Sequence, residues 1–198
     1  MEWDEEVLEY VGDLADYLSL HRYVGNRNGD TADYLAVTNS VDQQIEEMDA
    51  ACRFVQAKRR SDKRAYLCFD EWNVWYRAPG ADENDPFPQH RLEEIYNLED
   101  ALVVAGFFHS FLRHADVVKI ANIAQIVNVI APVLTREDDI LIQSIFHPFE
   151  MFSKRRKGVS LGLNIEGPTY DSASYGTTGY VDASVVHDGD LLHLFATN

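Results

Sequence analysis

Ala65-Tyr66-Leu67-Cys68-Phe69-Asp70-Glu71 is an apolar strand pattern that ends in two carboxylates, and it decides how the rest of the chain is organised. Two further apolar runs with strand character lie at residues 17–23 and 117–121. Apolar residues recur at spacings of three and four before each strand, which indicates helices over about residues 3–15, 41–55 and 92–114. The alternation of helix and strand predicts parallel β/α units joined by right-handed crossovers.

Local patterns add detail to these elements. Because side chains alternate along a strand, Ser19, His21 and Tyr23 should share one face of the first strand. The spacing Asn97-x-x-Asp100 is close to a helix-capping arrangement. Residues 122–132 fit either a helix or an irregular segment.

The residue composition and pattern change after about residue 158. Gly, Ser, Thr and Pro there separate short runs of period two, such as residues 181–185. Asp188-Gly189 offers a hairpin turn into residues 191–195. We therefore expect an α/β domain over residues 1–150 and an all-β module over residues 151–198.

Composition limits the possible partners. Hydrophobic residues make up 46% of the 198 residues, so the chain can bury a core. A formal charge of −16 disfavours nucleic acids and anionic membranes, and the basic run at residues 154–157 is more typical of a solvated surface. The longest uncharged stretch, residues 120–135, is too short and too polar for a membrane span. Two cysteines, Cys52 and Cys68, indicate neither a disulfide framework nor a zinc site.

Glu71 is the candidate for chemistry, since it stands at the carboxyl end of a strand in a β/α array. Taken alone it could be an ordinary solvent-facing acid. His21 and Tyr23 end the preceding strand and should lie beside it, while Trp72 and Trp75 offer flat apolar surfaces of the kind that stack on sugar rings. Singly, the histidine could be structural and the tryptophans part of the core. Together these residues predict a polar pocket with aromatic walls.

The sequence resembles one enzyme family. Asp70-Glu71-Trp72-Asn73-Val74-Trp75-Tyr76 looks like the nucleophile motif of the α-L-arabinofuranosidases of glycoside hydrolase family 51. Other stretches similar to that family are residues 19–26, 30–32, 99–106, 113–116, 124–132, 167–171 and 180–184. The resemblance implies the C-terminal portion, strands six to eight, of a (β/α)8 TIM barrel, followed by part of a β-sandwich domain.

The resemblance also implies roles for single residues. Glu71 would be the nucleophile that forms a covalent glycosyl-enzyme with a terminal arabinofuranoside. His21 and Tyr23 would orient this carboxylate and the sugar hydroxyls, Trp75 would wall the sugar site, and Gln125 would hydrogen-bond the sugar. The substrates would be arabinoxylan, arabinan or arabino-oligosaccharides, with no metal or organic cofactor. The parent enzyme would be cytoplasmic, which the absence of a signal peptide also favours, and a homo-oligomer, commonly a hexamer.

One essential part of such an enzyme is missing from the sequence. The family places its acid/base in an Asn-Glu pair at the end of barrel strand four, and the chain contains no such dipeptide. The acids between Asp82 and Asp85 are poor substitutes. We therefore expect a fragment that carries the nucleophile but is inactive alone, and that is only marginally stable because its sheet has open edges. The alternatives are a non-catalytic carbohydrate-binding or assembly subunit, and one chain of a split enzyme.

Overall fold

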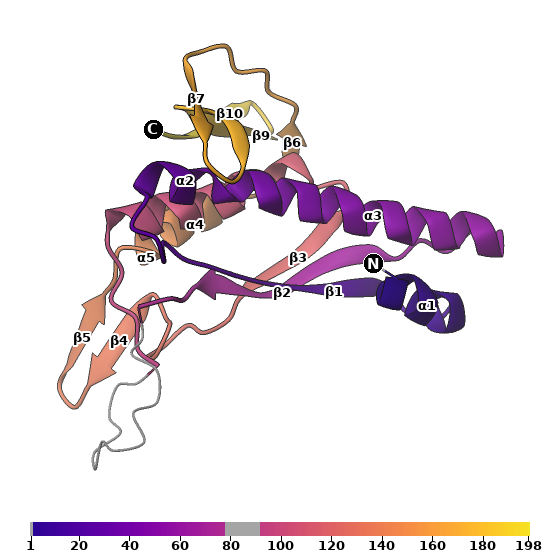
Figure 1. Ribbon diagram of the computed structural model, residues 1–198, viewed down its shortest axis with the longest axis horizontal. Coiled ribbons are helices and arrows are strands. Elements are labelled where there is room, and N and C mark those ends of the chain that lie inside the picture. Colours follow the sequence, from indigo (N-terminus) through magenta and orange to yellow (C-terminus); the bar gives the residue numbers. More distant parts are fainter. Residues whose placement is uncertain (1, 78–91) are drawn as a thin grey trace.

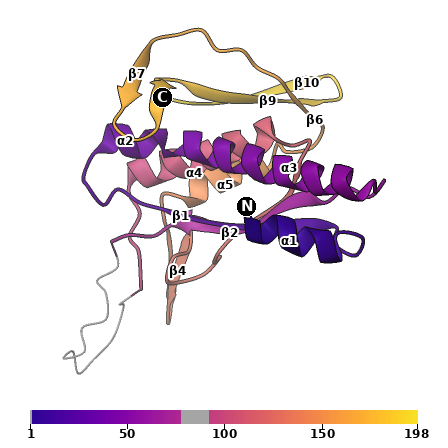
Figure 2. The same cartoon turned by 45° about the vertical axis from the view of Figure 1, so that its right-hand side comes forward.

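The computed structural model describes residues 2–77 and 92–198, and it consists of three layers (Figures 1 and 2). A three-stranded parallel sheet in the order β1-β2-β3 forms the first layer. Helices cover one face of it, and a strand-rich module lies on the far side of the helices. The sheet strands are β1 (Tyr17–Val24), β2 (Tyr66–Val74) and β3 (Val118–Ile123). The predicted α/β unit with parallel strands is confirmed.

The helical layer connects the strands. Its main members are two long helices that bury their apolar faces against β2. The helices are α1 (Glu2–Val11), α2 (Thr31–Leu35), the 3-10 turn η1 (Ala36–Thr38), α3 (Asn39–Arg59), α4 (Leu98–Arg113) and α5 (Phe146–Ser153). No helix in the described part of the chain is long and apolar enough to cross a membrane.

Helix α4 begins later than the sequence predicted, at Leu98 rather than near residue 92. The Asn97 side chain accepts a hydrogen bond from the Asp100 backbone N–H, and the Asp100 carboxylate accepts one from the Asn97 N–H, so the capping box is complete. The backbone N–H groups of Glu94 and Tyr96 donate to distant residues instead of to a helical turn. The helix therefore cannot extend back through residues 94–96.

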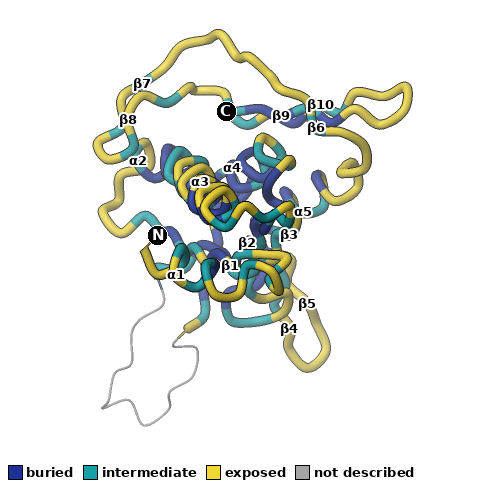
Figure 3. The backbone as a smooth tube through the Cα atoms, turned by 90° about the vertical axis from the view of Figure 1, so that its right-hand side faces the viewer, coloured by how far each residue is buried: buried dark blue, intermediate teal, exposed yellow. Residues whose placement is uncertain are grey.

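The chain after β3 is irregular rather than helical, the two alternatives that the sequence allowed for residues 122–132. Residues 124–132 are irregular, and a hairpin of β4 (Val133–Arg136) and β5 (Asp139–Ile142) follows them. This hairpin is exposed along most of its length (Figure 3). The acids at residues 82–85, considered above as substitutes for an acid/base, lie outside the described residues.

The C-terminal module is strand-rich, as predicted. Its sheet has the antiparallel order β10-β9-β6, and the two-residue turn Gly189-Asp190 joins β9 to β10 with Gly189 at a positive φ of 60°. A separate hairpin pairs β7 with β8. The strands are β6 (Val159–Leu161), β7 (Thr169–Ser172), β8 (Gly176–Gly179), β9 (Asp182–Asp188) and β10 (Leu191–Thr197).

This module packs on the helical layer through a small apolar cluster. Phe152 of α5 stacks on Phe195 of β10 with 4.1 Å between ring centroids. Next to them, the imidazole Nδ1 of buried His109 lies 2.9 Å from the Ser184 hydroxyl of β9. The predicted boundary at residue 150 falls inside α5, so the helix that carries it contacts both parts.

Aromatic rings form the centre of the main core, between the sheet and α4. Trp72 is fully buried and stacks on Phe107 at 4.8 Å between ring centroids. Phe69 and Phe111 close the cluster at their edges. This core lies behind β2 and so supports the strand end that carries Glu71.

Candidate active site

A β-bulge shapes the end of β2. Ser19 of β1 faces Cys68, but His21, two residues further, faces Glu71, so three steps along β2 match two along β1. The pairing of β2 with β3 shifts at the same place, across residues 69–72. One extra residue is therefore accommodated in β2, as in bulges that redirect side chains next to active sites.

The bulge changes which side chains share a face. Phe69 and Trp72 are both fully buried on the helical side, while Asp70 and Glu71 both project from the opposite, open face. Strict alternation would have placed Trp72 on the open face, and we predicted it there as part of the pocket wall. That prediction is wrong, because the bulge reverses the alternation and sends Trp72 into the core.

Side chains of β1 and β2 meet on the open face in a group that we call the Glu71 cluster: Ser19, His21, Tyr23, Asp70 and Glu71. The Tyr23 hydroxyl donates to Glu71 Oε1 at 2.7 Å. The two ring nitrogens of His21 lie 3.8 Å from Glu71 Oε2 and 3.4 Å from Asp70 Oδ1. The Ser19 hydroxyl donates to Asp70 at 2.7 Å, so Ser19, His21 and Tyr23 share one face as predicted.

The environment keeps Tyr23 protonated. Partial burial, followed by the hydrogen bond to Glu71 and the charge of that carboxylate, raises the pKa of the Tyr23 hydroxyl well above its usual value. Tyr23 is therefore a hydrogen-bond donor throughout the neutral range. A fixed donor on Oε1 leaves Oε2 as the oxygen that faces His21.

Trp75 extends the aromatic surface beside this cluster. Its ring meets the Tyr23 ring edge to face, with 5.5 Å between centroids and 64° between planes. The Trp75 backbone N–H donates to the Val24 carbonyl at 2.9 Å, which ties the ends of β1 and β2 together. The Trp75 side chain remains half-buried.

Gln125 lies on the irregular segment after β3. Its side-chain oxygen accepts a hydrogen bond from the Ile130 backbone N–H at 3.3 Å, and its side chain is exposed. The engaged oxygen leaves the Gln125 amide nitrogen, with its two N–H donors, for other contacts. Among the described residues, no hydrogen bond joins Gln125 to the Glu71 cluster.

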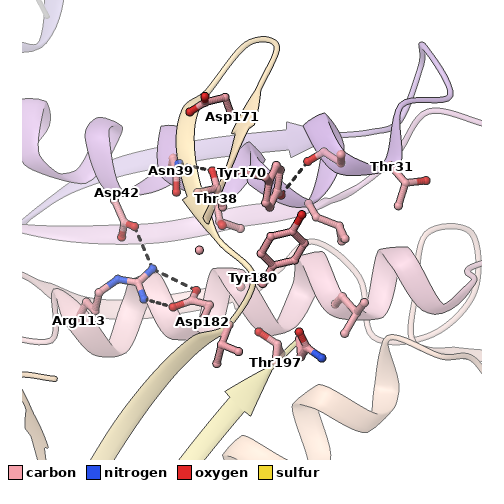
Figure 4. Close-up of a pocket in the computed structure, with 18 residues that line it drawn as sticks. Thr31, Thr38, Asn39, Asp42, Arg113, Tyr170, Asp171, Tyr180, Asp182 and Thr197 are labelled. Carbon is pink, nitrogen blue, oxygen red and sulfur yellow. Dashed lines mark hydrogen bonds and ion pairs between the residues drawn. The ribbon is translucent and has the colours of Figure 1, made fainter. Parts of the chain in front are cut away.

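A separate cavity of about 800 Å³ lies between the helices and the C-terminal strands (Figure 4). Tyr170 and Tyr180 line it together with Arg113. The Arg113 guanidinium is bound to Asp42 at 2.9 Å and to Asp182 at 2.6 Å, so its charge is already matched. None of the predicted site residues lines this cavity.

Comparison with known proteins identifies the family. Residues 70–193 match the family model for the α-L-arabinofuranosidase C-terminal domain. The chain belongs to the α-L-arabinofuranosidase family. The matched region of this arabinofuranosidase chain begins at the bulge that carries Asp70 and Glu71.

Relatives and solved structures agree with this family. The chain is 42% identical to the intracellular exo-α-(1→5)-L-arabinofuranosidase of Halalkalibacterium halodurans and 43% identical to one from Bacillus subtilis. All of the chain is covered in both matches, but it spans only 41% of the length of each relative. A family 51 α-L-arabinofuranosidase from Bifidobacterium longum superposes with a TM-score of 0.90 at 29% identity, covering all of this chain and 43% of that one.

The sequence patterns did not predict two buried polar residues of this arabinofuranosidase chain. Glu94 is fully buried, and Gln143 is 4% exposed. The Glu94 side chain binds backbone groups that follow Trp75, and the Gln143 side chain binds the carbonyl of Ala131, in the segment that carries Gln125. No local pattern singled them out, because their partners lie 12–49 residues away in the sequence.

Proposed function

We propose that this chain is the nucleophile-bearing portion of a retaining exo-α-L-arabinofuranosidase. The observation that carries the proposal is the Glu71 carboxylate at the carboxyl end of β2, oriented by the Tyr23 hydroxyl and flanked by Trp75. The relatives named as exo-acting α-L-arabinofuranosidases support a terminal arabinofuranoside as substrate. Arabinoxylan, arabinan and arabino-oligosaccharides contain such residues.

In the proposed reaction, a Glu71 oxygen attacks the anomeric carbon while the bond to the leaving oxygen breaks, giving a glycosyl-enzyme ester. Water then cleaves the ester and releases arabinose with retained configuration. Tyr23 and His21 keep the carboxylate aimed at the sugar, and Trp75 provides an apolar wall. Gln125 would donate from its amide nitrogen to a sugar oxygen, since its own oxygen is engaged.

Retention requires a second carboxyl about 5–5.5 Å from the nucleophile. Asp70 is the nearest carboxylate in sequence, but it is bound to Ser19 and lies next to His21. We therefore propose that the acid/base comes from polypeptide outside this sequence. In that case β1, β2 and β3 would be strands six to eight of a (β/α)8 barrel within residues 1–150, and residues 151–198 would be part of a β-sandwich.

The complete enzyme would then cover the open face of this sheet with the remaining barrel strands. By analogy with its relatives, we propose a cytoplasmic enzyme that assembles as a homo-oligomer, with a hexamer as the expected form. The named intracellular relatives support this location. The mechanism relies on two carboxyl groups and assigns no role to nucleic acid or membrane.

An activated substrate can test Glu71 in the chain alone. 2,4-Dinitrophenyl α-L-arabinofuranoside has a leaving group that needs no protonation, so the first step can proceed without the acid. We expect intact-mass spectrometry to detect one added arabinosyl group and peptide mapping to place it on Glu71. Glu71→Gln should abolish the adduct, whereas Glu137→Gln, at an exposed site in the β4–β5 turn, should not. An adduct on another residue, or one that survives Glu71→Gln, would overturn the assignment.

A non-catalytic carbohydrate-binding or assembly subunit is the second candidate. It is favoured by the lack of an uncommitted second carboxylate in the Glu71 cluster as described. Calorimetry with arabino-oligosaccharides separates the two. Binding without an adduct from the activated substrate supports the binding subunit, and robust turnover of an unactivated arabinoside would contradict the proposal that the acid/base lies elsewhere.

A further inference from the structure

Glu94 is a buried carboxylate directly behind residues 75–77, the segment that follows β2. Its Oε1 accepts hydrogen bonds from two consecutive backbone N–H groups, Tyr76 at 2.5 Å and Arg77 at 2.6 Å. The Arg77 guanidinium also lies 4.0 Å from its second oxygen. One side-chain oxygen that accepts two consecutive backbone N–H groups in a buried site fixes them, because no water is there to replace it. The backbone immediately after Trp75 is therefore held from behind.

The backbone of Glu94 is attached to a second segment, the one that carries Gln125. The Glu94 N–H donates to the Val129 carbonyl at 3.0 Å. Val129 and its neighbour Asn128 both have a left-handed backbone, with φ values of 60° and 62°. This conformation is unfavourable for a β-branched residue and persists only where surrounding contacts impose it.

The strained turn determines where the Gln125 amide lies. Ile130, the residue after Val129, uses its N–H to bind the Gln125 side-chain oxygen at 3.3 Å. On the other side of the turn, Asn128 Oδ1 accepts from the Thr135 N–H at 2.7 Å. A displaced Val129 would move the Ile130 N–H and with it the Gln125 side chain.

The Gln143 side chain joins residues 94–96 to the end of the strained turn. Its side-chain nitrogen donates to the carbonyls of Glu94 at 3.2 Å and Ala131 at 2.8 Å, and its oxygen accepts from the Tyr96 N–H at 3.1 Å. The segment of residues 94–96 is thus fixed to the end of the strained turn. Glu94 binds the backbone on both sides, at Tyr76 and Arg77 and at Val129. The Asn73 side chain, which donates to the Ile130 carbonyl, is a second link between the end of β2 and this turn.

We propose that Glu94 is a positioning residue, which holds Trp75 and Gln125 at a fixed separation on two sides of the sugar site. What the site binds rests on the proposed function, but the positioning role rests on the contacts of Glu94 alone. Glu94 touches neither the Glu71 cluster nor the open face, because it is fully buried behind them. It acts through the Tyr76-Arg77 backbone on one side and through Val129 on the other.

Nuclear magnetic resonance of the 198-residue chain tests this without a ligand. In Glu94→Ala we expect the Trp75 indole N–H and the Gln125 side-chain amide signals to shift or broaden together. The Tyr76 and Arg77 amides should exchange with solvent roughly tenfold faster, as expected for the loss of a buried hydrogen bond. Glu137→Ala, which removes an exposed glutamate, should leave all four groups unchanged.

The Glu94→Gln variant and the unmodified chain serve as two further comparisons. Glu94→Gln retains one carbonyl oxygen, so it should give smaller changes of the same kind, and it replaces the Ala variant if that variant does not fold. In the unmodified chain, the Tyr76 and Arg77 amides should be protected from exchange. The proposal is wrong if those amides exchange like exposed ones, or if the Trp75 and Gln125 signals in Glu94→Ala match those of the unmodified chain.

A titration with α-1,5-linked arabinobiose separates this proposal from the proposed function. We expect it to shift the Trp75 and Gln125 signals of the unmodified chain, with roughly tenfold weaker binding in Glu94→Ala, the size of effect that a small misplacement of binding groups produces. If the disaccharide shifts no signal in the unmodified chain, its binding to the site fails, while the ligand-free spectra still decide the role of Glu94. Equal affinity in both forms would contradict positioning.

Discussion

Replacing Phe107 with alanine tests whether the aromatic core between the sheet and α4 supplies most of the stability of the α/β unit. Phe107 is fully buried and lies within 6.4 Å of Trp72, Phe69 and Phe111, measured between ring centroids. A phenylalanine buries roughly 150–250 Å², which at about 25 cal/mol per Å² corresponds to about 4–6 kcal/mol as an upper value. Alanine retains part of this, and truncations of this kind cost about 3–5 kcal/mol.

The assay is urea unfolding, followed by tryptophan fluorescence and circular dichroism. With a slope of about 2 kcal/mol per molar urea, the loss should lower the unfolding midpoint by about 1.5–2.5 M. Phe54→Ala is the matched control, because Phe54 is 54% exposed on α3 and its removal should change stability by less than about 0.5 kcal/mol. A chain that is only marginally stable would unfold without urea in the Phe107 variant. Equal midpoints for the two variants would refute the reasoning.

Two further predictions concern the ends of the strands and the contact between the layers. Gly25→Ala should lower the unfolding free energy by about 1–3 kcal/mol, because the added Cβ would lie 2.3 Å from the Tyr76 Cβ. Gly162→Ala should leave the unfolding free energy unchanged, because nothing lies within 4 Å of the added atom. Urea unfolding midpoints compare the two variants. Lowering the pH from 7.5 to 5.5 should reduce the unfolding free energy, because the unfolded chain then gains a proton on His109 that the ring buried against Ser184 resists in the fold. The pH dependence of the unfolding free energy reports this.

The sign of the His109 effect follows from the direction of its pKa shift. Burial lowers the pKa of His109 below its usual value, and the charge of Arg113 adds to this, against opposing contributions from Asp182 and Asp42. The unfolded chain therefore binds the proton more tightly, so the stabilisation is complete above the unfolded pKa of about 6.5 and declines as the pH falls toward the folded pKa. A His109→Gln variant should lose this dependence. If its slope equals that of the unmodified chain, another group is responsible.

Short-range patterns predicted much of the fold correctly. The alternation in β1 placed Ser19, His21 and Tyr23 on one face. Asp188-Gly189 marked the hairpin between β9 and β10 to within one residue of its turn at Gly189-Asp190. The capping spacing at Asn97 was also correct, although the apolar pattern before it suggested a longer helix. These features depend on neighbours within a few residues, which a single sequence displays directly.

Features that depend on pairing between distant segments could not be predicted in the same way. The bulge arises only when β2 is aligned with β1 and β3, so the sequence did not show that Trp72, expected in the pocket wall with Trp75, points into the core. No local pattern marks Glu94 as buried, and only its contacts with backbone groups 17 and 18 residues away show that it supports the segment after Trp75. The β4–β5 hairpin escaped because its turn, at residues 137–138, contains neither Gly nor Asn.

Because of the bulge, β2 can lose one residue at this position and still send the same side chains into the core. If Asp70 were deleted, the remaining residues would alternate strictly, with Phe69 and Trp72 still inward and Glu71 still outward. A deletion elsewhere in the regular part of the strand would instead exchange its inner and outer side chains. The unfolding midpoint of the deletion variant would measure what the bulge and the Asp70 contacts together contribute to stability. Protein engineers could therefore shorten or restore this strand at a single position and leave the aromatic core in place.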